Sequence, residues 1–195
     1  AALRAAFADI GPPVRSSAAG SGSLASAVLA PCYEDDDGLH VVLTRRSGAL
    51  RVHSGEVAFP GGRQDPGEDL TGTALREAWE EVDLDPETVE IIGELDHLST
   101  VTSRSFIAPY VGVLSGPPEL RANPGEVDAI LRVPFSELLD PEVFREERWP
   151  IFGTERSIVF FELFGDTVWG ATAAMLRQLL GIVTGTLGRG QIDHD

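Results

Sequence analysis

The sequence predicts an α/β fold in which a mixed β-sheet lies between layers of helices. Two observations predict it. Apolar segments of strand length recur along the chain and outnumber the segments with helical periodicity. One helical segment, residues 69–82, lies in the middle of the chain, where it interrupts the strands. Since 43% of the 195 residues are hydrophobic, the chain can bury the core of one domain. We therefore expect an α/β/α sandwich.

Composition sets the expected boundaries of this domain. Residues 1–9 favour a short helix, and the small polar residues that follow favour a linker, so we assign 1–23 to an N-terminal arm. The glycine-rich sequence from residue 185 onward predicts a flexible tail over 185–195. The folded domain is expected to span residues 24–184.

The first two strands are expected at residues 24–33 and 40–45. The Asp-Gly pair at 37–38 lies between them and favours a hairpin, because both residue types tolerate tight turns. The connection over residues 48–62 is long and rich in glycine. Connections of this length inside compact domains are usually functional.

The central helix is expected over residues 69–82. Leu75, Ala78, Trp79 and Val82 recur at helical spacing within it, so they are expected to form its buried face. The acidic residues are expected to lie largely on the opposite side. Further strands are expected at residues 89–100, 105–114, 127–133 and 157–163. Further helices are expected at residues 134–139 and 170–182.

The central helix crowds three carboxylates onto one face. Glu77, Glu80 and Glu81 stand at positions i, i+3 and i+4, which are neighbours on a helix surface. Like charges at this spacing destabilise a helix by roughly 0.2–0.5 kcal/mol per pair. A hard divalent cation, Mg²⁺ or Mn²⁺, would offset that repulsion, because such ions take oxygen ligands. From these residues alone, a solvated acidic face with i,i+4 ion pairs remains the alternative.

The spacing around these glutamates resembles the Nudix box, whose pattern is GX5EX7REUXEEXGU with U a bulky aliphatic residue. Gly62 and Glu68 match its start, and the run from Arg76 to Leu84 matches its end. Ala78 is smaller than the usual aliphatic residue, and Asp83 replaces a glycine that normally ends the helix in a left-handed conformation. Asp tolerates that conformation better than most residues, so we expect the same turn.

The resemblance implies a Nudix-type α/β/α sandwich and a metal-dependent hydrolase of diphosphates. It implies that Glu80 and Glu81 bind the metal most directly, that Glu77 assists, and that Arg76 acts by orienting Glu68. Metal ligands are therefore expected among Glu68, Glu77, Glu80 and Glu81. Catalytic residues are expected among Arg76, Glu77, Glu80, Glu81 and Glu126.

The segment just before the box resembles a second, narrower pattern, LLTXR(S/A)X3RX3GX3FPGG, which is found in coenzyme A diphosphatases. Residues 42–62 follow it with one departure, Val42 for leucine. This similarity implies that the substrate is coenzyme A, which carries a 3′-phosphate as well as a diphosphate. Arginines and close-approaching backbone would bind those groups. The expected substrate-binding residues are Arg46, Arg51, Arg63, Gly61 and Gly62.

Glu126 is the best additional carboxylate outside the box. It lies in Asn123-Pro124-Gly125-Glu126-Val127, which resembles an NPXEV segment of the same family. The resemblance implies that a glutamate here completes the metal shell or serves as the general base. An exposed carboxylate at the edge of a strand is the alternative.

Charge and cysteine content narrow the partners. A net charge of −16 disfavours binding to the outside of a nucleic acid, whose phosphates would repel the protein. An anionic small substrate is still compatible, because a metal ion and nearby arginines reverse the local sign. One cysteine and no apolar run long enough to cross a bilayer favour the cytoplasm. A monomer and a homodimer are both compatible with the sequence.

We therefore predict a Mg²⁺- or Mn²⁺-dependent pyrophosphohydrolase that cleaves coenzyme A or its derivatives to 3′,5′-ADP and 4′-phosphopantetheine or its acyl form. The first alternative is a Nudix hydrolase of ADP-ribose, NADH or another nucleoside diphosphate derivative. The second is a Nudix domain without catalytic activity that binds a nucleotide for regulation. The complete set of box glutamates disfavours this second alternative.

Overall fold

The structure is a computed structural model, and it describes residues 2–16, 24–48, 55–99, 105–151 and 153–191. Its main sheet has the strand order β3-β2-β1-β7-β5, while β4 pairs with β1, β6 with β7 and β8 with β2. β1 and β7 are parallel and the other pairs are antiparallel, so the sheet is mixed, as predicted. The strands are β1 Leu24–Asp35, β2 Gly38–Arg46, β3 Val57–Ala58, β4 Gly61–Arg63, β5 Glu90–Glu94, β6 Leu98–Ser99, β7 Ser105–Val113 and β8 Val127–Pro134.

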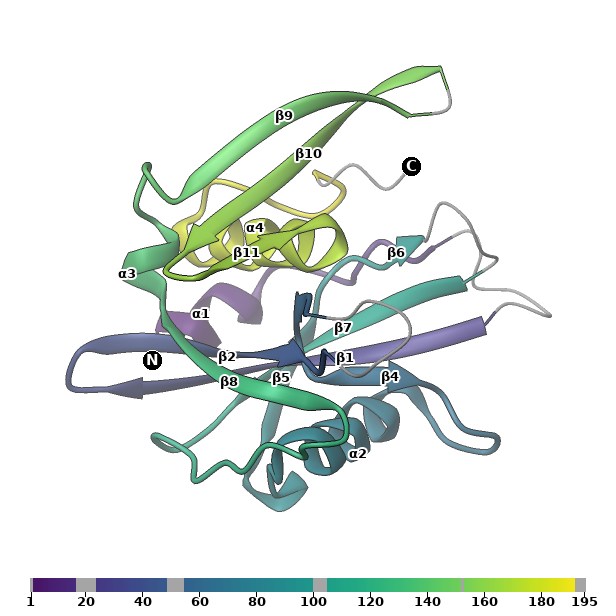
Figure 1. Cartoon of the computed structure of the whole chain (residues 1–195), viewed down its shortest axis with the longest axis vertical. Coiled ribbons are helices and arrows are strands. Elements are labelled where there is room, and N and C mark those ends of the chain that lie inside the picture. The colour runs from purple at the N-terminus through teal and green to yellow at the C-terminus, as the bar shows by residue number, and fades with distance from the viewer. Residues whose placement is uncertain (1, 17–23, 49–54, 100–104, 152, 192–195) are drawn as a thin grey trace.

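Helices cover both faces of this sheet (Figure 1). α2 (Leu70–Val82) packs on one face, and α1 (Ala2–Ala8) and α4 (Gly170–Thr184) lie on the other. A short helix, α3 (Phe135–Leu138), follows β8, and a 3₁₀ turn spans Pro86–Thr88. The predicted α/β/α sandwich is therefore confirmed. None of the described helices is both long and apolar enough to cross a membrane.

A second, smaller antiparallel sheet lies beyond α4, with the strand order β11-β10-β9 (Figure 1). Its strands are β9 Phe144–Ile151, β10 Thr154–Leu163 and β11 Asp166–Trp169. Of these, β10 was expected, whereas β9 and β11 were not. β9 was not expected because four consecutive charged residues between its ends, Arg145 to Arg148, lack the apolar alternation that identifies a strand. β11 is four residues long and runs directly into α4.

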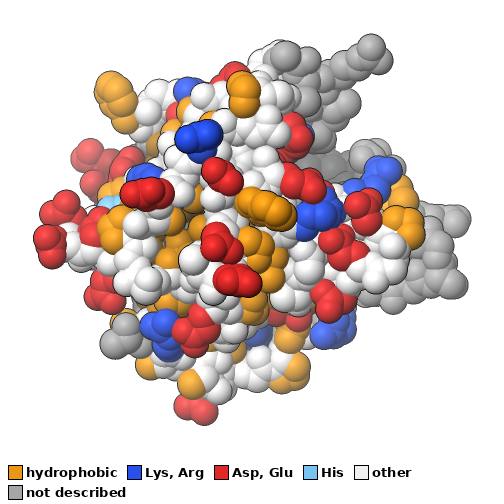
Figure 2. Space-filling view, turned by 90° about the horizontal axis from the view of Figure 1, so that it is seen from below, with side chains coloured by type: hydrophobic (Ala, Val, Ile, Leu, Met, Phe, Trp, Pro, Cys, Tyr) orange, Lys and Arg blue, Asp and Glu red, His pale blue; other side chains and the backbone are white. Residues whose placement is uncertain are grey.

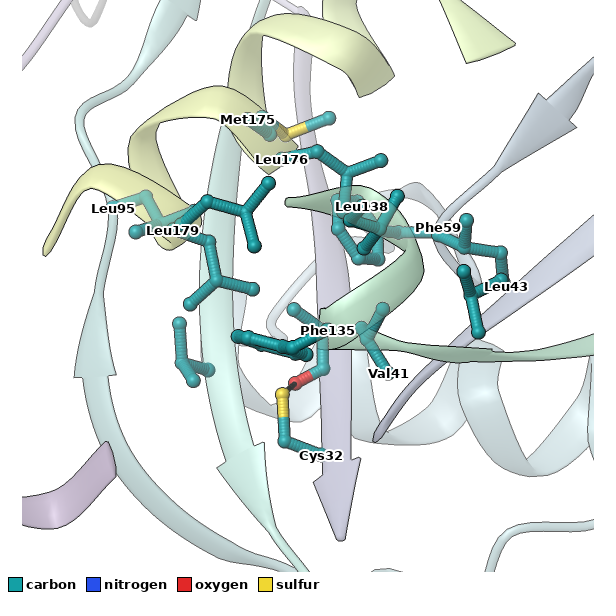
Figure 3. Packing of buried hydrophobic residues seen from close by; sticks show 14 of the residues in the cluster. Cys32, Val41, Leu43, Phe59, Leu95, Phe135, Leu138, Met175, Leu176 and Leu179 are labelled. Carbon is teal, nitrogen blue, oxygen red and sulfur yellow. Dashed lines mark hydrogen bonds between the residues drawn. The ribbon is translucent and has the colours of Figure 1, made fainter. Parts of the chain in front are cut away.

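The larger of two apolar cores lies between the main sheet and α4. In Figure 3, Met175, Leu176 and Leu179 of α4 extend toward Phe135 and Val41 on the other side of the core. Cys32 lies fully buried at the base of this cluster as a free thiol. Cys32 thus packs as a small buried hydrophobic residue.

The buried face of α2 differs from the expected one. Trp79 is 56% exposed, whereas Ala74, Ala78 and Glu81 are buried. Small residues face β1 because they let the helix approach the sheet closely, and the bulky indole lies at the edge of that contact. The helical periodicity is confirmed, since Ala78 and Val82 are buried, but the buried face includes Glu81 and excludes Trp79. One of the acidic residues, Glu81, therefore lies inside.

The strand expected at residues 89–100 is broken into β5 and β6, and Asp96 lies at the break. Its carboxylate is fully buried and accepts hydrogen bonds from the backbone N–H groups of Val14 and Gly190 at 2.8 and 2.6 Å. The Nε2 atom of Gln178 in α4 donates to it at 2.6 Å, and the Asp96 N–H donates back to the Gln178 side-chain oxygen at 2.9 Å. Asp96 thus connects the N-terminal arm, α4 and the C-terminal segment.

The segment after α4 folds back onto the helix. α4 ends at Gly185 in a left-handed turn, with φ at 70°. The residues beyond it fold back, so that Leu187 packs against Gly181 and leaves no room for a side chain there. Gly190 bonds to Asp96, as described above. The segment after α4 is thus hydrogen-bonded through Gly190 to the buried Asp96.

Candidate active site

The ends of α2 are fixed by local interactions that the sequence encodes. The Asp69 side chain caps the first turn by accepting from the Gly72 N–H at 2.6 Å. At the other end, Asp83 adopts the left-handed conformation at φ 58°, and its N–H donates to the Trp79 carbonyl at 2.8 Å. The prediction that Asp83 replaces a left-handed glycine is confirmed. The acidic residues of α2 are thereby held in one register.

Three carboxylates converge where α2 meets the start of β8. Oxygen atoms of Glu77, Glu81 and Glu126 all lie within 4.8 Å of one another. The chain before β8 is tied to the end of α2, because the Asn123 N–H donates to the Glu81 carbonyl at 2.9 Å. On the other side, the Ser47 N–H donates to the Glu126 carbonyl at 2.8 Å. Backbone bonds from two directions therefore bring Glu126 to the helix.

The electrostatics of this cluster favour a cation. Burial, together with the nearby charges of Glu77 and Glu126, raises the pKa of Glu81 to about 7, although Arg46 and the Gly61 N–H act in the opposite direction. Burial likewise raises the pKa of Glu77, against the effect of Arg76. Raised pKa values mean that the nearby arginines do not fully neutralise the carboxylates. Three oxygen donors in this state fit a hard divalent ion such as Mg²⁺ or Mn²⁺.

Arg76 organises the other two box glutamates. Its Nε lies 2.9 Å from Glu68 Oε1, and its Nη1 lies 3.0 Å from both Glu77 Oε1 and Glu80 Oε2. This guanidinium is the main reason that the pKa of Glu68 falls to about 2. Glu80 is half exposed. In this structure Glu68 and Glu80 thus contact Arg76, whereas Glu77 contacts Arg76 and also belongs to the three-carboxylate cluster.

Both glycines of β4 are required by close packing around the carboxylates. A Cβ on Gly62 would lie closer than 3.0 Å to all three carboxylate atoms of Glu77. A Cβ on Gly61 would overlap the backbone of Ala27 and Val28 in β1. The Gly61 N–H also donates to Glu81 Oε2 at 3.3 Å. These glycines were expected to approach substrate, and here they make room for the glutamates and the sheet.

The three candidate arginines occupy different positions. Arg46 lies at the end of β2, with its Nη1 at 3.5 Å from Glu81 Oε1. Arg63 is exposed, and its carbonyl accepts from Arg76 Nη2 at 3.2 Å. Arg51 lies outside the described residues. The structure therefore brings Arg46 to the carboxylate cluster and leaves the side chain of Arg63 at the surface.

A β-bulge directs Arg46 toward the cluster. The register between β2 and β8 shifts between Arg45 and Arg46, and Asp128 is the extra residue on β8. The Asp128 carboxylate accepts from the Gly48 N–H at 2.9 Å, just after β2. Arg45 points to the other side, where it forms an ion pair with Asp166 of β11 at 3.2 Å. The roles of Asp128 and Asp166 carry no local signal in the sequence, because both depend on strand pairing.

The surface around α2 is acidic, as the net charge of −16 implies. Figure 2 shows this side of the molecule, where acidic side chains are spread over the face and basic ones are interspersed among them. A buried cation site within such a surface attracts metal ions more readily than it attracts free anions.

Comparisons with known protein families and sequences agree with the fold and the carboxylate cluster described above. A family described as the NUDIX domain matches residues 23–152. The chain is 38% identical over 140 residues to an uncharacterised Nudix hydrolase, NudL, of Photorhabdus laumondii, with 71% of this chain and 74% of that protein covered. It is 39% identical to the chloroplastic Nudix hydrolase 22 of Arabidopsis thaliana, with 81% of this chain and 55% of that longer protein covered.

Solved structures show the same fold at low sequence identity. An Ap4A hydrolase of Caenorhabditis elegans aligns with a TM-score of 0.51 at 18% identity, covering 60% of this chain and 83% of that one. The NUDIX domain of Shewanella oneidensis NrtR, solved with ADP ribose, aligns with a TM-score of 0.50 at 21% identity, covering 64% of this chain and 80% of that one.

Proposed function

Because the chain belongs to the Nudix hydrolase family, whose members cleave acid anhydrides, we propose that it hydrolyses the diphosphate of coenzyme A or its derivatives. The products would be 3′,5′-ADP and 4′-phosphopantetheine or its acyl form. The observation that carries the proposal is the contact between Arg46 and Glu81 at 3.5 Å. Arg46 belongs to the pattern that resembles coenzyme A diphosphatases, and its contact with Glu81 supports a link between that pattern and the acidic cluster.

The chain's own residues divide the work. Glu77, Glu81 and Glu126 would hold a Mg²⁺ or Mn²⁺ ion, which supplies positive charge for the diphosphate oxygens. Arg76 would fix Glu77 and position Glu68 and Glu80 beside the cluster. Glu126 would either complete the ligand set or accept the proton of the water that attacks phosphorus. Attack by that water breaks one P–O bond of the anhydride, and the proton leaves to the base.

Arginines would provide the binding energy for the anionic substrate. Arg46 would bind the diphosphate, a role supported by its position at the edge of the cluster. Arg51 and Arg63 are the candidates for the 3′-phosphate. Since all lysine and arginine positions, 15 in total, are arginine, each such contact can be two-pronged.

We propose that the protein is located in the cytoplasm. Two relatives are described as chloroplastic and mitochondrial, so location differs within the family, and cell fractionation tests it for this chain.

The alternative with independent support is a Nudix hydrolase of ADP-ribose or another nucleoside diphosphate derivative. A structural neighbour was solved with ADP ribose, and another is described as an Ap4A hydrolase. Both are similar to this chain in fold alone. Residues 42–62 favour coenzyme A, because their additional arginines would bind its 3′-phosphate, a group that ADP-ribose lacks.

One assay tests these alternatives together. The protein is incubated with Mg²⁺ in ¹⁸O water and equal concentrations of coenzyme A, dephospho-coenzyme A, ADP-ribose and NADH, and the products are identified by mass. We expect 3′,5′-ADP to dominate, with ¹⁸O in one of the two phosphate products. Faster cleavage of ADP-ribose or NADH would replace the proposal with the alternative. An Arg51→Ala variant is expected to raise KM for coenzyme A more than for dephospho-coenzyme A.

A further inference from the structure

Arg46 has an unsatisfied donor beside the carboxylate cluster. Its Nη1 pairs with Glu81 Oε1 at 3.5 Å, which is long for an ion pair. Its Nε is buried and has no hydrogen-bond acceptor among the described residues. A buried N–H without an acceptor carries a desolvation penalty, because it has given up its hydrogen bond to water. The guanidinium is therefore placed for an acceptor that the described residues do not supply.

Glu81 is also incompletely neutralised. Its side chain is 2% exposed, and it shares its surroundings with the carboxylates of Glu77 and Glu126. The Gly61 N–H donates to one of its oxygens, and Arg46 lies near the other. Arg76 is already occupied with Glu68, Glu77 and Glu80. Within the described parts of the chain, Arg46 is therefore the arginine that partly balances Glu81.

We propose that Arg46 exchanges partners during the catalytic cycle: it pairs with Glu81 while the carboxylate cluster lacks its cation, and it turns to the diphosphate of the substrate once a divalent cation neutralises Glu81. This inference rests on the proposed function for the identity of the substrate. It adds an order of binding, with the cation before the substrate.

Electrostatics give the reason for the exchange. Arg46 and a divalent cation compete for the same carboxylate, and two positive groups at one oxygen repel each other. With the cation in place, Arg46 loses its attraction to Glu81 and keeps a fork of N–H donors. A diphosphate offers oxygens that match this fork, including an acceptor for the unsatisfied Nε. The exchange therefore gives Arg46 an anionic partner both before and after the cation binds.

The first test measures metal affinity without substrate. Mn²⁺ is titrated into wild type, Arg46→Met and Arg45→Met at pH 8, with free Mn²⁺ followed by electron paramagnetic resonance. Arg45→Met is the matched control, because it removes the same charge from the neighbouring position, where the side chain pairs with Asp166. We expect Arg46→Met to bind Mn²⁺ several-fold more tightly than wild type and Arg45→Met to change little. An Arg46→Met affinity that is unchanged or weaker overturns the exchange.

The second test measures the affinity for a diphosphate, the other proposed partner of Arg46. Methylenediphosphonate, a diphosphate analogue that resists hydrolysis, is titrated calorimetrically with and without Mg²⁺. Wild type is expected to bind it only with Mg²⁺, and Arg46→Met to lose at least tenfold in that affinity. Arg46→Lys keeps the charge but not the fork, so it should retain wild-type Mn²⁺ affinity and still bind the diphosphonate more weakly. Equal diphosphonate affinity in wild type and Arg46→Lys overturns the proposal, even if Arg46→Met does not fold.

These outcomes are separable from those of the proposed function. If wild type fails to cleave coenzyme A but Arg46→Met shows the gain in Mn²⁺ affinity, the exchange stands and the substrate assignment fails. If wild type cleaves coenzyme A and the Mn²⁺ affinities of wild type and Arg46→Met are equal, the function stands and the exchange fails.

Discussion

The carboxylates of Glu81 and Glu126 approach within 4.8 Å although one lies on a helix and the other at the start of a strand. Two backbone bonds produce this contact, one from Asn123 to the end of α2 and one from Ser47 to Glu126. The site is therefore assembled from three separate parts of the chain. Its acidic centre consists of Glu77, Glu81 and Glu126. From this arrangement we derive predictions that do not follow from the box pattern alone.

Glu81→Gln is expected to reduce kcat far more than Glu80→Gln. Glu81 is buried in the cluster, whereas Glu80 is half exposed and bonded to Arg76. Removing one preorganised electrostatic group, such as an oxyanion-hole donor, costs about 10²–10³ in kcat, and we expect a loss of that order for Glu81→Gln. Glu80→Gln should lose no more than roughly tenfold, as for an outer ligand. Steady-state kinetics at saturating Mg²⁺ check both, and equal losses in the two variants would contradict this assignment.

Arg76→Gln is expected to destabilise the protein in a pH-dependent way. Removing the guanidinium leaves carboxylates that it bonded, at a cost of about 1–3 kcal/mol. Because the pKa of Glu68 falls from 4.5 to about 2 in the folded state, the stability that this carboxylate contributes is fully present above pH 4.5 and is lost as the pH falls through about 2. The difference in unfolding free energy between wild type and Arg76→Gln should therefore shrink across this window.

Urea unfolding of both proteins at several pH values measures that difference. Arg148→Gln, an exposed arginine on β9, is the matched control and should show a small difference at every pH. A gap for Arg76→Gln that stays constant from about pH 6 to pH 2 would exclude Glu68 as its main partner.

Asp128→Ala is expected to raise KM with little change in kcat. Asp128 bonds the Gly48 N–H at the bulge and so fixes where the chain leaves β2 toward residue 51. One such bond is worth about 1–1.5 kcal/mol, which corresponds to a rise in KM of roughly 5–13-fold. Asp128→Asn keeps an acceptor oxygen and should restore most of the affinity. A change in kcat without a change in KM would place Asp128 in the chemistry instead.

Features encoded by residues close in sequence were predictable. The helix 70–82, its Asp69 cap and the left-handed Asp83 follow from local propensity and spacing. The contact of Arg76 with Glu80 follows from their i,i+4 spacing on the helix. These features depend on one segment of chain, so the pattern contains the information that determines them.

Features that depend on packing between distant segments were not predictable. Periodicity gives a stripe on a helix but does not fix which edge of the stripe meets the sheet, so Trp79 was placed inside and Glu81 outside. Nothing near Asp96 in the sequence distinguishes it from other charged residues. Its anchoring role depends on hydrogen bonds from Val14, Gln178 and Gly190, which are distant in sequence. Glu126 could be connected to the box by family resemblance, but its approach to Glu81 depends on the folded loop before β8.

Asp96→Ala is expected to lower the free energy of unfolding by about 2–4 kcal/mol, because it leaves buried donors without an acceptor. Although burial alone would raise its pKa, the bonds from Val14, Gly190 and Gln178 hold the pKa of Asp96 below its usual value. Asp36→Ala, in the exposed hairpin turn, is the control and should stay within roughly 0.5 kcal/mol of wild type. Urea denaturation checks both, and similar midpoints would contradict the anchoring role of Asp96.

Asp83 offers a test of how this chain departs from the usual glycine at the end of the box helix. Asp83→Asn removes a negative charge from a helix C-terminus and should stabilise by about 0.3–1 kcal/mol. Asp83→Gly removes the same charge and also suits φ 58°, so it should be the most stable of the set. Asp83→Ala keeps a Cβ without a polar side chain and should lie roughly 1–2 kcal/mol below the glycine variant. Thermal melts rank the four proteins, and an alanine variant as stable as the glycine variant would show that the left-handed turn carries no strain here.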